Sequence, residues 1–375
     1  MNNILKVEFY DEFNCIADRC SFTCCEGWQI IIDTDTYNKW NSNKNQSKYF
    51  SKNVRLKKRT EEAEHYLKMG PQMHCPFLDE KGLCNIVIKF GEDYLSKTCK
   101  IFPRQENRLG EVNEHSLSCA CPAVVDILNK RNGKINFLYE GDISSYESYG
   151  EAYKIKEVML KVLQNSRVPF RDKILLSFHI LLSLKKELII TNEIINKYED
   201  DESLISLISI WNEIEIDYED SCQEKNELFL DIGQNYRKEK NFSKYLIDLS
   251  EYAENLDIEN TQAQWDKFKV EFKQYEKLFE NCIVSKVFAN CCSDDIDELV
   301  MSFQEIITEY VMVEHTSFLK WLMDKQKEIN YCDIRDYIVI YSRIIGYNAE
   351  GIKEFWEDSF DDAVWDFGYM LLLLR

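Results

Sequence analysis

The stretch that follows Pro169 constrains the fold most, because it lacks nearly all the residues that break helices. All five prolines lie at or before Pro169. From Arg171 to Arg375 the sequence contains only four glycines. Proline and glycine mark most turns and helix ends, so their scarcity favours long helices. Apolar residues at helical spacing support this, as in ESYGEAYKIKEVMLKVLQN just before the proline.

We therefore predict consecutive amphipathic helices in the C-terminal part, without a repeat of fixed period. The predicted helical stretches are 147–165, 169–187, 188–198, 202–211, 238–252, 262–288, 295–311, 318–329, 334–345 and 349–374. The last of them contains Trp356, Phe360, Trp365 and Tyr369, which we interpret as core packing, among acids that would face solvent.

The N-terminal part is predicted to be irregular, with short elements between cysteines. We expect a short strand over 28–32, then a helix capped by Asp33 to Asp35. The basic run VRLKKR is followed by EEAEHYLKM, which we predict as a helix. The fold class is thus mainly α: an irregular cysteine-rich domain with short strands over 1–140, then an all-helical domain over 141–375. The stretch 130–142 is interpreted as a turn-rich connection.

Charge and apolar content exclude several classes of protein. The chain has 46 basic and 66 acidic residues and a net charge of −20, all of it in the C-terminal part, since residues 1–140 carry 20 basic and 19 acidic groups. Such a chain would repel nucleic acid. No apolar run approaches the roughly 20 residues of a membrane-spanning helix, and the N-terminus does not resemble a signal peptide. We expect no nucleic-acid partner, no membrane and a cytoplasmic location.

The cysteines are the main chemical signal. In a reducing cytoplasm the 14 cysteines must serve metal binding, redox chemistry or packing. Thiolates select zinc or iron–sulfur clusters. Nine of the cysteines lie in residues 1–121, which is more than one four-ligand site uses. Either some of these nine are buried and bind no metal, or there are two sites. His74 and His115 adjoin cysteines and are further candidate ligands. The candidate metal ligands are Cys15, Cys20, Cys24, Cys25, Cys75, Cys84, Cys99, Cys119 and Cys121.

The arrangement of these cysteines resembles a known family. The segment FNCIADRCSFTCCEGW, followed by Ile32-Asp33, resembles the N-terminal signature of flagellin lysine-N-methylases. CPFLDEKGLCNI and TCKIFPR are similar to later blocks of that family, and also to a broader family of cysteine-cluster domains described as zinc- or iron-chelating. The resemblance covers residues 9–122 by motif. Beyond them it rests on length and a helical, acidic C-terminal region.

The resemblance implies methyl transfer from S-adenosylmethionine to surface lysines of flagellin, and an iron–sulfur cluster, [4Fe–4S] in form, held by the cysteines. An aromatic face suits a sulfonium, and an arginine suits the carboxylate of the methyl donor. Trp28, Phe102 and Arg104 adjoin the cysteines and are the candidate cofactor-binding residues. No GxGxG segment between a strand and a helix is present, so a Rossmann-type site is not expected.

Two further functions remain open from the sequence. The first alternative is a non-catalytic binding module in which zinc or iron only holds the N-terminal domain together. A weaker one is an iron–sulfur electron-transfer protein. Binding of S-adenosylmethionine would distinguish the enzyme from both. The sequence leaves the catalytic base, the true ligands among the nine cysteines, the target lysines and the oligomeric state open.

Overall fold

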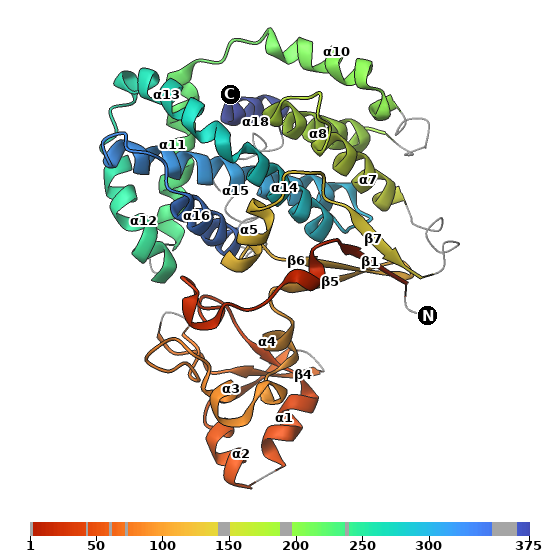
Figure 1. Ribbon diagram of the computed structural model, residues 1–375, viewed down its shortest axis with the longest axis vertical. Coiled ribbons are helices and arrows are strands. Elements are labelled where there is room, and N and C mark those ends of the chain that lie inside the picture. Colours follow the sequence, from red (N-terminus) through yellow and green to blue (C-terminus); the bar gives the residue numbers. More distant parts are fainter. Residues whose placement is uncertain are drawn as a thin grey trace.

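The protein folds into two lobes of unequal size, shown as a ribbon in Figure 1. The computed structural model describes residues 3–42, 44–59, 62–71, 74–141, 151–187, 197–236, 240–346 and 366–375. Helices dominate the larger lobe, which also holds a four-stranded sheet. The smaller lobe is drawn in red and orange below it, and it carries most of the cysteine segments.

The sheet of the large lobe joins strands from both ends of the N-terminal part. Its order is β5-β6-β1-β7, with bounds β1 (Asn3–Val7), β5 (Arg104–Leu109), β6 (Val112–Leu117) and β7 (Phe137–Glu140). β1 runs parallel to β6 and antiparallel to β7. Along β1 buried and partly exposed positions alternate, so Leu5 and Val7 enter the core against the helices.

The helices of the large lobe pack around one long central helix, α15 (Ile296–Met323), which is buried along most of its length. α15 contacts α8, α11, α12, α14 and α16. The other helices are α5 (Pro122–Asn129), α7 (Glu151–Leu163), α8 (Phe170–Lys185), α10 (Asp201–Asn212), α11 (Tyr218–Tyr236), α12 (Lys240–Ala253), α13 (Gln262–Phe272), α14 (Glu276–Asn290), α16 (Tyr331–Ile344) and α18 (Phe367–Leu374). None of the described helices is both long and apolar enough to span a bilayer.

Most of the predicted helices are confirmed, with changes at their joints. The stretch 262–288 is two helices, α13 and α14, separated by a short turn at Lys273–Tyr275. The stretches 295–311 and 318–329 were predicted as two helices, but the first and residues 318–323 of the second lie on the single helix α15, which ends at Met323. The prediction for 188–198 lies almost entirely outside the described residues. Most of the stretch predicted as a helix over 349–374 also lies outside the described residues, including Trp356, Phe360 and Trp365. Its last part is described and forms α18.

The small lobe has its own core and a three-stranded sheet. The strands are β2 (Ile31–Ile32), β3 (Val54–Arg59) and β4 (Glu62–Leu67), in the order β2-β4-β3, and the helices are α1 (Thr34–Asn41), α2 (Lys44–Ser51), α3 (Asn85–Phe90) and α4 (Lys97–Ile101). The rings of Trp40 and Phe50 stack 4.3 Å apart at the centre of this core. The strand predicted over 28–32 is confirmed only for Ile31–Ile32, and the helix capped by Asp33 is confirmed.

Two sequence predictions in the N-terminal part are wrong. EEAEHYLKM is not a helix, because residues Glu62–Leu67 form β4, which pairs with β3 on one side and β2 on the other. Helix propensity is a weak preference, and pairing with two strands overrides it. The stretch 130–142 is more than a connection, since it contains β7, which pairs with β1.

The sheet and the helices of the large lobe share one hydrophobic core. That core contains residues of β1, β6 and α5 together with those of the helices after residue 150, while the small lobe has a separate one. β6 and α5 both contact α14. Packing thus joins the beginning and the end of the N-terminal part to the helical body. The division into one domain over 1–140 and another over 141–375 stays a prediction.

Candidate functional site

The first cysteine segment passes from one core to the other: Phe22 packs in the core of the large lobe, and Trp28 packs against that of the small lobe. The indole Nε1 of Trp28 donates a hydrogen bond of 2.8 Å to the carbonyl of Cys24. Gly27 has φ +87°, a conformation that glycine adopts without strain, and it turns the chain between the cysteines and β2. The amide of Cys25 donates to the Oγ1 of Thr23 at 3.2 Å. These local bonds fix the course of the chain around Cys24 and Cys25.

Backbone pairing brings the second cysteine segment against the first. The amide of Cys75 donates to the carbonyl of Cys25 at 2.9 Å. Beside this bond Glu26 pairs with His74, whose Nδ1 lies 2.5 Å from the carboxylate Oε1. His74 thus contacts an acid at the edge of the cysteines. His115, the other histidine considered, lies on β6 and packs against the ring of Tyr10.

Short helices position the remaining cysteines of the small lobe. Cys84 precedes the first residue of α3, and Cys99 lies on α4. The Oγ of Ser96 caps α4 and accepts the amide of Cys99 at 3.2 Å. Caps of this kind fix where a helix begins, and therefore where its first side chains point.

The thiols of these segments interact directly. Cys24 contacts Cys25, and Cys25 contacts Cys75. The contact with Cys25, followed by burial, raises the pKa of Cys24. For Cys25 the contact with Cys24 lowers the pKa, but Cys75 and burial outweigh it, so the pKa is raised. Burial raises the pKa of Cys99 to about 11, and the neighbouring Cys24 and Cys84 add to the effect.

A second group of thiols approaches Cys24 from the side of the large lobe. Burial raises the pKa of Cys121 to about 12, and the nearby Cys20 and Cys24 raise it further. Burial also raises the pKa of Cys20, and the nearby Cys24 and Cys15 raise it further. Pairwise effects on pKa thus link eight of the nine predicted ligands, which we call the thiol cluster: Cys15, Cys20, Cys24, Cys25, Cys75, Cys84, Cys99 and Cys121.

Cys119 lies apart from the thiol cluster. Its buried thiol contacts Cys282 of α14, and this hydrogen bond lowers the pKa of Cys119 while it raises that of Cys282. Cys119 also lines a small pocket beside Lys286, Glu309 and Ser342. There the ammonium of Lys286 donates to both Glu309 and Ser342. The sequence signal for this pocket is weak, because Lys286 and Glu309 are two of several charged residues on α14 and α15.

The thiol cluster is not arranged as a finished metal site. Within the described parts of the chain, no three His, Cys, Asp or Glu side chains stand so that they could hold one metal ion. Burial and neighbouring thiols raise the pKa of Cys24, Cys25 and Cys99, which disfavours their thiolate forms.

The three candidate cofactor-binding residues separate into a pair and a single residue. The rings of Trp28 and Phe102 lie 5.9 Å apart, next to Cys24 and just after α4. The guanidinium of Arg104, at the start of β5, lies over the rings of Tyr10 and Phe13, at 5.5 and 5.2 Å. Trp28 and Phe102 thus form an aromatic pair beside the thiol cluster, and Arg104 packs on aromatic rings of the large lobe.

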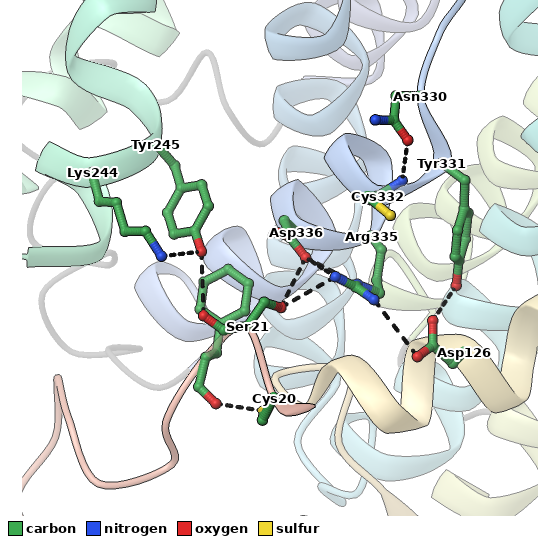
Figure 2. Close-up of polar contacts among 11 residues, drawn as sticks. Cys20, Ser21, Asp126, Lys244, Tyr245, Asn330, Tyr331, Cys332, Arg335 and Asp336 are labelled. Atoms are coloured by element: carbon green, nitrogen blue, oxygen red, sulfur yellow. Dashed lines mark hydrogen bonds and ion pairs between the residues drawn. The ribbon is translucent and has the colours of Figure 1, made fainter. Parts of the chain in front are cut away.

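Polar contacts from α16 hold the loop after Cys20 against the helical body, as Figure 2 shows. The Nη2 of Arg335 donates to the Oγ of Ser21 at 3.2 Å, and Ser21 Oγ donates to Asp336 at 3.3 Å. From α12, the hydroxyl of Tyr245 donates to the carbonyl of Ser21 at 3.3 Å. The sequence analysis missed these residues, because nothing in a helical pattern tells which surface meets a loop some 300 positions away.

The helical body matches the family model described as the FliB lysine N-methylase C-terminal domain, over residues 156–373. The chain is 34% identical over 130 residues to the Flagellar biosynthetic protein FliU of Salmonella muenchen, covering 34% of this chain and 77% of that protein. It is 33% identical over 130 residues to a Lysine-N-methylase of Salmonella typhimurium and to another of Salmonella choleraesuis, covering 34% of this chain and 32% of each relative.

The match therefore spans about a third of the length of the two lysine-N-methylases. No solved structure matches the chain.

Proposed function

Because this chain belongs to the FliB lysine N-methylase family, we propose that it is a protein lysine N-methyltransferase that acts on flagellin. The observation that carries the proposal is the family match, which extends over residues 156–373 and so over most of the helical body. Two relatives bear the name Lysine-N-methylase and a third is named as a flagellar biosynthetic protein, which supports a flagellar substrate. We also propose that it works in the cytoplasm.

The methyl donor we propose is S-adenosylmethionine. The lone pair of the deprotonated lysine amine forms a bond to the methyl carbon, and the carbon–sulfur bond breaks with its electron pair going to sulfur. The proton of the amine leaves to a base or to water. An aromatic pair can face a sulfonium, and Trp28 with Phe102 supplies one beside the thiol cluster. Arg104 is the candidate partner for the donor's carboxylate.

The thiol cluster suits a soft metal or an iron–sulfur cluster, and we propose [4Fe–4S] with zinc as the alternative. Its donors are thiols, and neighbouring thiols help to raise the pKa of Cys24, Cys25 and Cys99, so a metal cation would relieve the repulsion among their thiolates. Cys24, Cys25, Cys75 and Cys99, with Cys84 near Cys99, are the residues that would hold it. A bound cluster would cross-link segments that are far apart in the sequence.

The enzymatic proposal is tested with purified protein, S-adenosylmethionine carrying a labelled methyl group, and flagellin. We expect label on lysines of flagellin and none on flagellin whose lysines have been acetylated beforehand. The melting temperature should rise with the methyl donor, since a ligand of the folded state stabilises it. If neither label nor melting shift appears with metal-loaded protein, the enzyme is excluded and the non-catalytic metal-binding module is favoured.

Metal content is tested separately, on protein purified without oxygen. An absorbance near 400 nm with about four iron and four sulfide per chain would support [4Fe–4S]. Zinc without sulfide would support the structural alternative. Protein with neither metal would overturn the proposal that the thiol cluster binds one.

A further inference from the structure

The outer side of α10 carries two adjacent rows of exposed residues. α10 packs on the helical body through its other side, where the buried residues are Leu204, Ile208 and Trp211. The exposed rows have a spacing of four positions, and they consist of Glu202, Ser206, Ile210 and Ile214, and of Ile205, Ser209 and Glu213. Residues four apart are neighbours on a helix surface, so we call these two rows the α10 face. Figure 1 shows α10 at the end of the large lobe that is farther from the small lobe.

The α10 face leaves an unusual amount of apolar surface exposed. Ile205, Ile210 and Ile214 are 51%, 62% and 51% exposed. Ile214 lies just past the helix, and its amide continues the last turn by donating to the carbonyl of Trp211 at 3.2 Å. Elsewhere in the described residues, large apolar side chains that are exposed occur singly along the chain, as does Val270 of α13. Single apolar residues on a surface need no explanation, whereas a group of them indicates a contact surface.

The charged residues around these isoleucines are all acidic. Residues 199–224 include ten acidic residues and no basic one. Glu202 and Glu213 of the α10 face are exposed, and neither has a cation at ion-pair distance among the residues that the structure describes. Asp201, by contrast, pairs with Arg167 at 2.9 Å. The carboxylates of Glu202 and Glu213 can therefore pair with the cations of another molecule.

Apolar side chains among acids restrict which partner fits the α10 face. Two copies of the chain joined through this face across a twofold axis would bring the same acids together, and like charges repel. An anionic membrane would be repelled in the same way. A protein segment with apolar side chains flanked by lysines complements both the isoleucines and the acids. A lysine methyltransferase acts on proteins that carry lysines, so we assign this segment to the substrate.

We propose that the α10 face docks an apolar, lysine-bearing segment of the protein substrate, apart from the lysine that is methylated. Ile205, Ile210 and Ile214 bury apolar side chains of that segment, and Glu202 and Glu213 pair with its lysines at the edge. Contacts that are equally strong before and during the reaction lower KM and leave kcat unchanged. The inference rests on the proposed function, because lysine methylation identifies the occupant.

The test measures the affinity of the full chain for flagellin by biolayer interferometry, without methyl donor. In the apolar variant, Ile210→Ser with Ile214→Ser, the dissociation constant should rise about 5- to 30-fold, because central apolar contacts of the interface are lost. The charge variant, Glu202→Gln with Glu213→Gln, should bind about threefold more weakly than the parent at low salt. Above about 0.5 M NaCl this difference should disappear, because salt screens exposed charges.

Each variant has a matched control outside the α10 face. Val270→Ser removes a single apolar side chain that is 76% exposed on α13. Glu254→Gln with Glu259→Gln removes two exposed acids that follow α12. Both controls should bind flagellin within about twofold of the parent, as residues outside an interface do. Acetylation of the flagellin lysines should weaken binding to the parent more than to the charge variant, and an equal effect would contradict pairing with lysines.

Methylation kinetics give a second readout, since the apolar variant should raise KM for flagellin with little change in kcat. Affinity and KM equal to those of the parent in both variants would overturn the docking face and leave lysine methylation intact. Sedimentation of the chain alone tests the other occupant: a parent dimer that the apolar variant dissociates would assign the face to a second copy and overturn the inference. A parent chain that transfers no methyl group to flagellin would overturn the proposed function itself, so the two failures are distinguishable.

Discussion

Single residues affect the free energy of unfolding most where charged groups are buried away from solvent. Lys156 of α7 and Glu114 of β6 are each 1% exposed, and their charged atoms lie 2.6 Å apart. The ammonium also lies 3.4 Å from the carbonyl of Phe288, to which it donates. This pair ties the sheet to the helices within the core. Removing one partner would leave the other charged and buried, which is far costlier than losing an exposed pair.

We expect Lys156→Met to lower the free energy of unfolding by about 3–5 kcal/mol, because Glu114 loses its partner. Urea unfolding followed by circular dichroism measures the loss. The double variant Lys156→Met with Glu114→Leu should regain much of the lost free energy of unfolding, because no unpaired charge stays buried. The control is Arg167→Met, which breaks an exposed pair with Asp201 and should cost less than about 1 kcal/mol. Equal losses for the two single variants would contradict the expectation.

A buried histidine makes the stability depend on pH. Burial, with help from Lys225, lowers the pKa of His315 to about 3. Its Nε2 lies 3.1 Å from the Oδ1 of Asn226 and donates to it in the neutral ring. The unfolded chain takes up a proton near pH 6.5, and the folded chain does not. Protonation therefore favours unfolding, and stability is lost as the pH falls below that value.

Between about pH 7 and pH 5, His315 should cost the parent about 2 kcal/mol of unfolding free energy. The variant His315→Gln keeps a side-chain donor toward Asn226 but cannot take up this proton. Its free energy of unfolding should therefore lack the loss that His315 causes between these pH values. The measurement is urea unfolding of both proteins at the two pH values. Burial raises the pKa of Glu305 to about 7, but that group titrates equally in both proteins and cancels in the difference. Parallel pH profiles would show that His315 is not buried in the neutral form.

At the residue scale, the sequence predicted that the N-terminal cysteines lie near one another, but not which of them lies elsewhere. Close spacing predicts shared surroundings for Cys20, Cys24 and Cys25, and the structure brings these thiols near one another. Cys119 and Cys121 are only two positions apart, yet Cys119 contacts Cys282 on α14. Spacing limits the length of a loop, but it does not tell which distant helix packs against each residue.

Elements follow local sequence wherever the pattern of burial is simple. α8, α16 and the core face of α7 are apolar at helical spacing, and each was predicted. α11 was missed because its buried face includes Ser221, Lys225 and Asn226, so hydrophobic periodicity gives little signal there. The β3–β4 hairpin was missed because charged residues with good helix propensity take the strand conformation once a partner strand is present.

Asp33 connects two helices of the small lobe, α1 and α4, and we expect its removal to destabilise both. Its Oδ1 accepts the amide of Thr36 at 2.9 Å and so caps α1. Its Oδ2 accepts the amide of Lys97, the first residue of α4, at 2.7 Å. Burial alone would raise the pKa of Asp33, but the amides of Lys97 and Thr36 outweigh it and lower the pKa. The charged carboxylate is therefore the form that fits.

We expect Asp33→Ala to destabilise α1 and α4 by about 1–2 kcal/mol, the usual cost of a lost cap. Hydrogen exchange of backbone amides should show faster exchange in both helices. Asp200→Ala is the matched control, since Asp200 caps α10 through the amide of Ser203 at 2.9 Å. Its effect should be confined to α10. Faster exchange in α1 alone would mean that the bond to Lys97 does not support α4.

For the whole molecule, the distribution of charge bears on substrate capture. The residues after 140 carry 26 basic and 47 acidic groups, so the helical body is strongly negative. A field of this sign would attract a surface rich in lysine. Solubility alone would also account for the charge, and ionic strength distinguishes the two explanations.

If the field steers flagellin, kcat/KM for methylation should fall several-fold between about 0.05 and 0.5 M NaCl, because salt shortens the range of electrostatic attraction. The value of kcat should change little, since it concerns the complex already formed. A short uncharged peptide with one lysine serves as the control and should be less sensitive to salt. A flat profile for flagellin would assign the charge to solubility.

The path of the chain through the sheet of the large lobe has a consequence for biosynthesis. β1 ends at Val7, but its parallel neighbour β6 begins only at Val112, after the whole small lobe. At ribosomal speeds of about 5–20 residues per second, β1 leaves the ribosome about 5–20 s before β6. During that interval its apolar residues have no native partner strand. The nascent chain would thus be exposed to misassociation, and to chaperones that bind such segments, until β6 emerges.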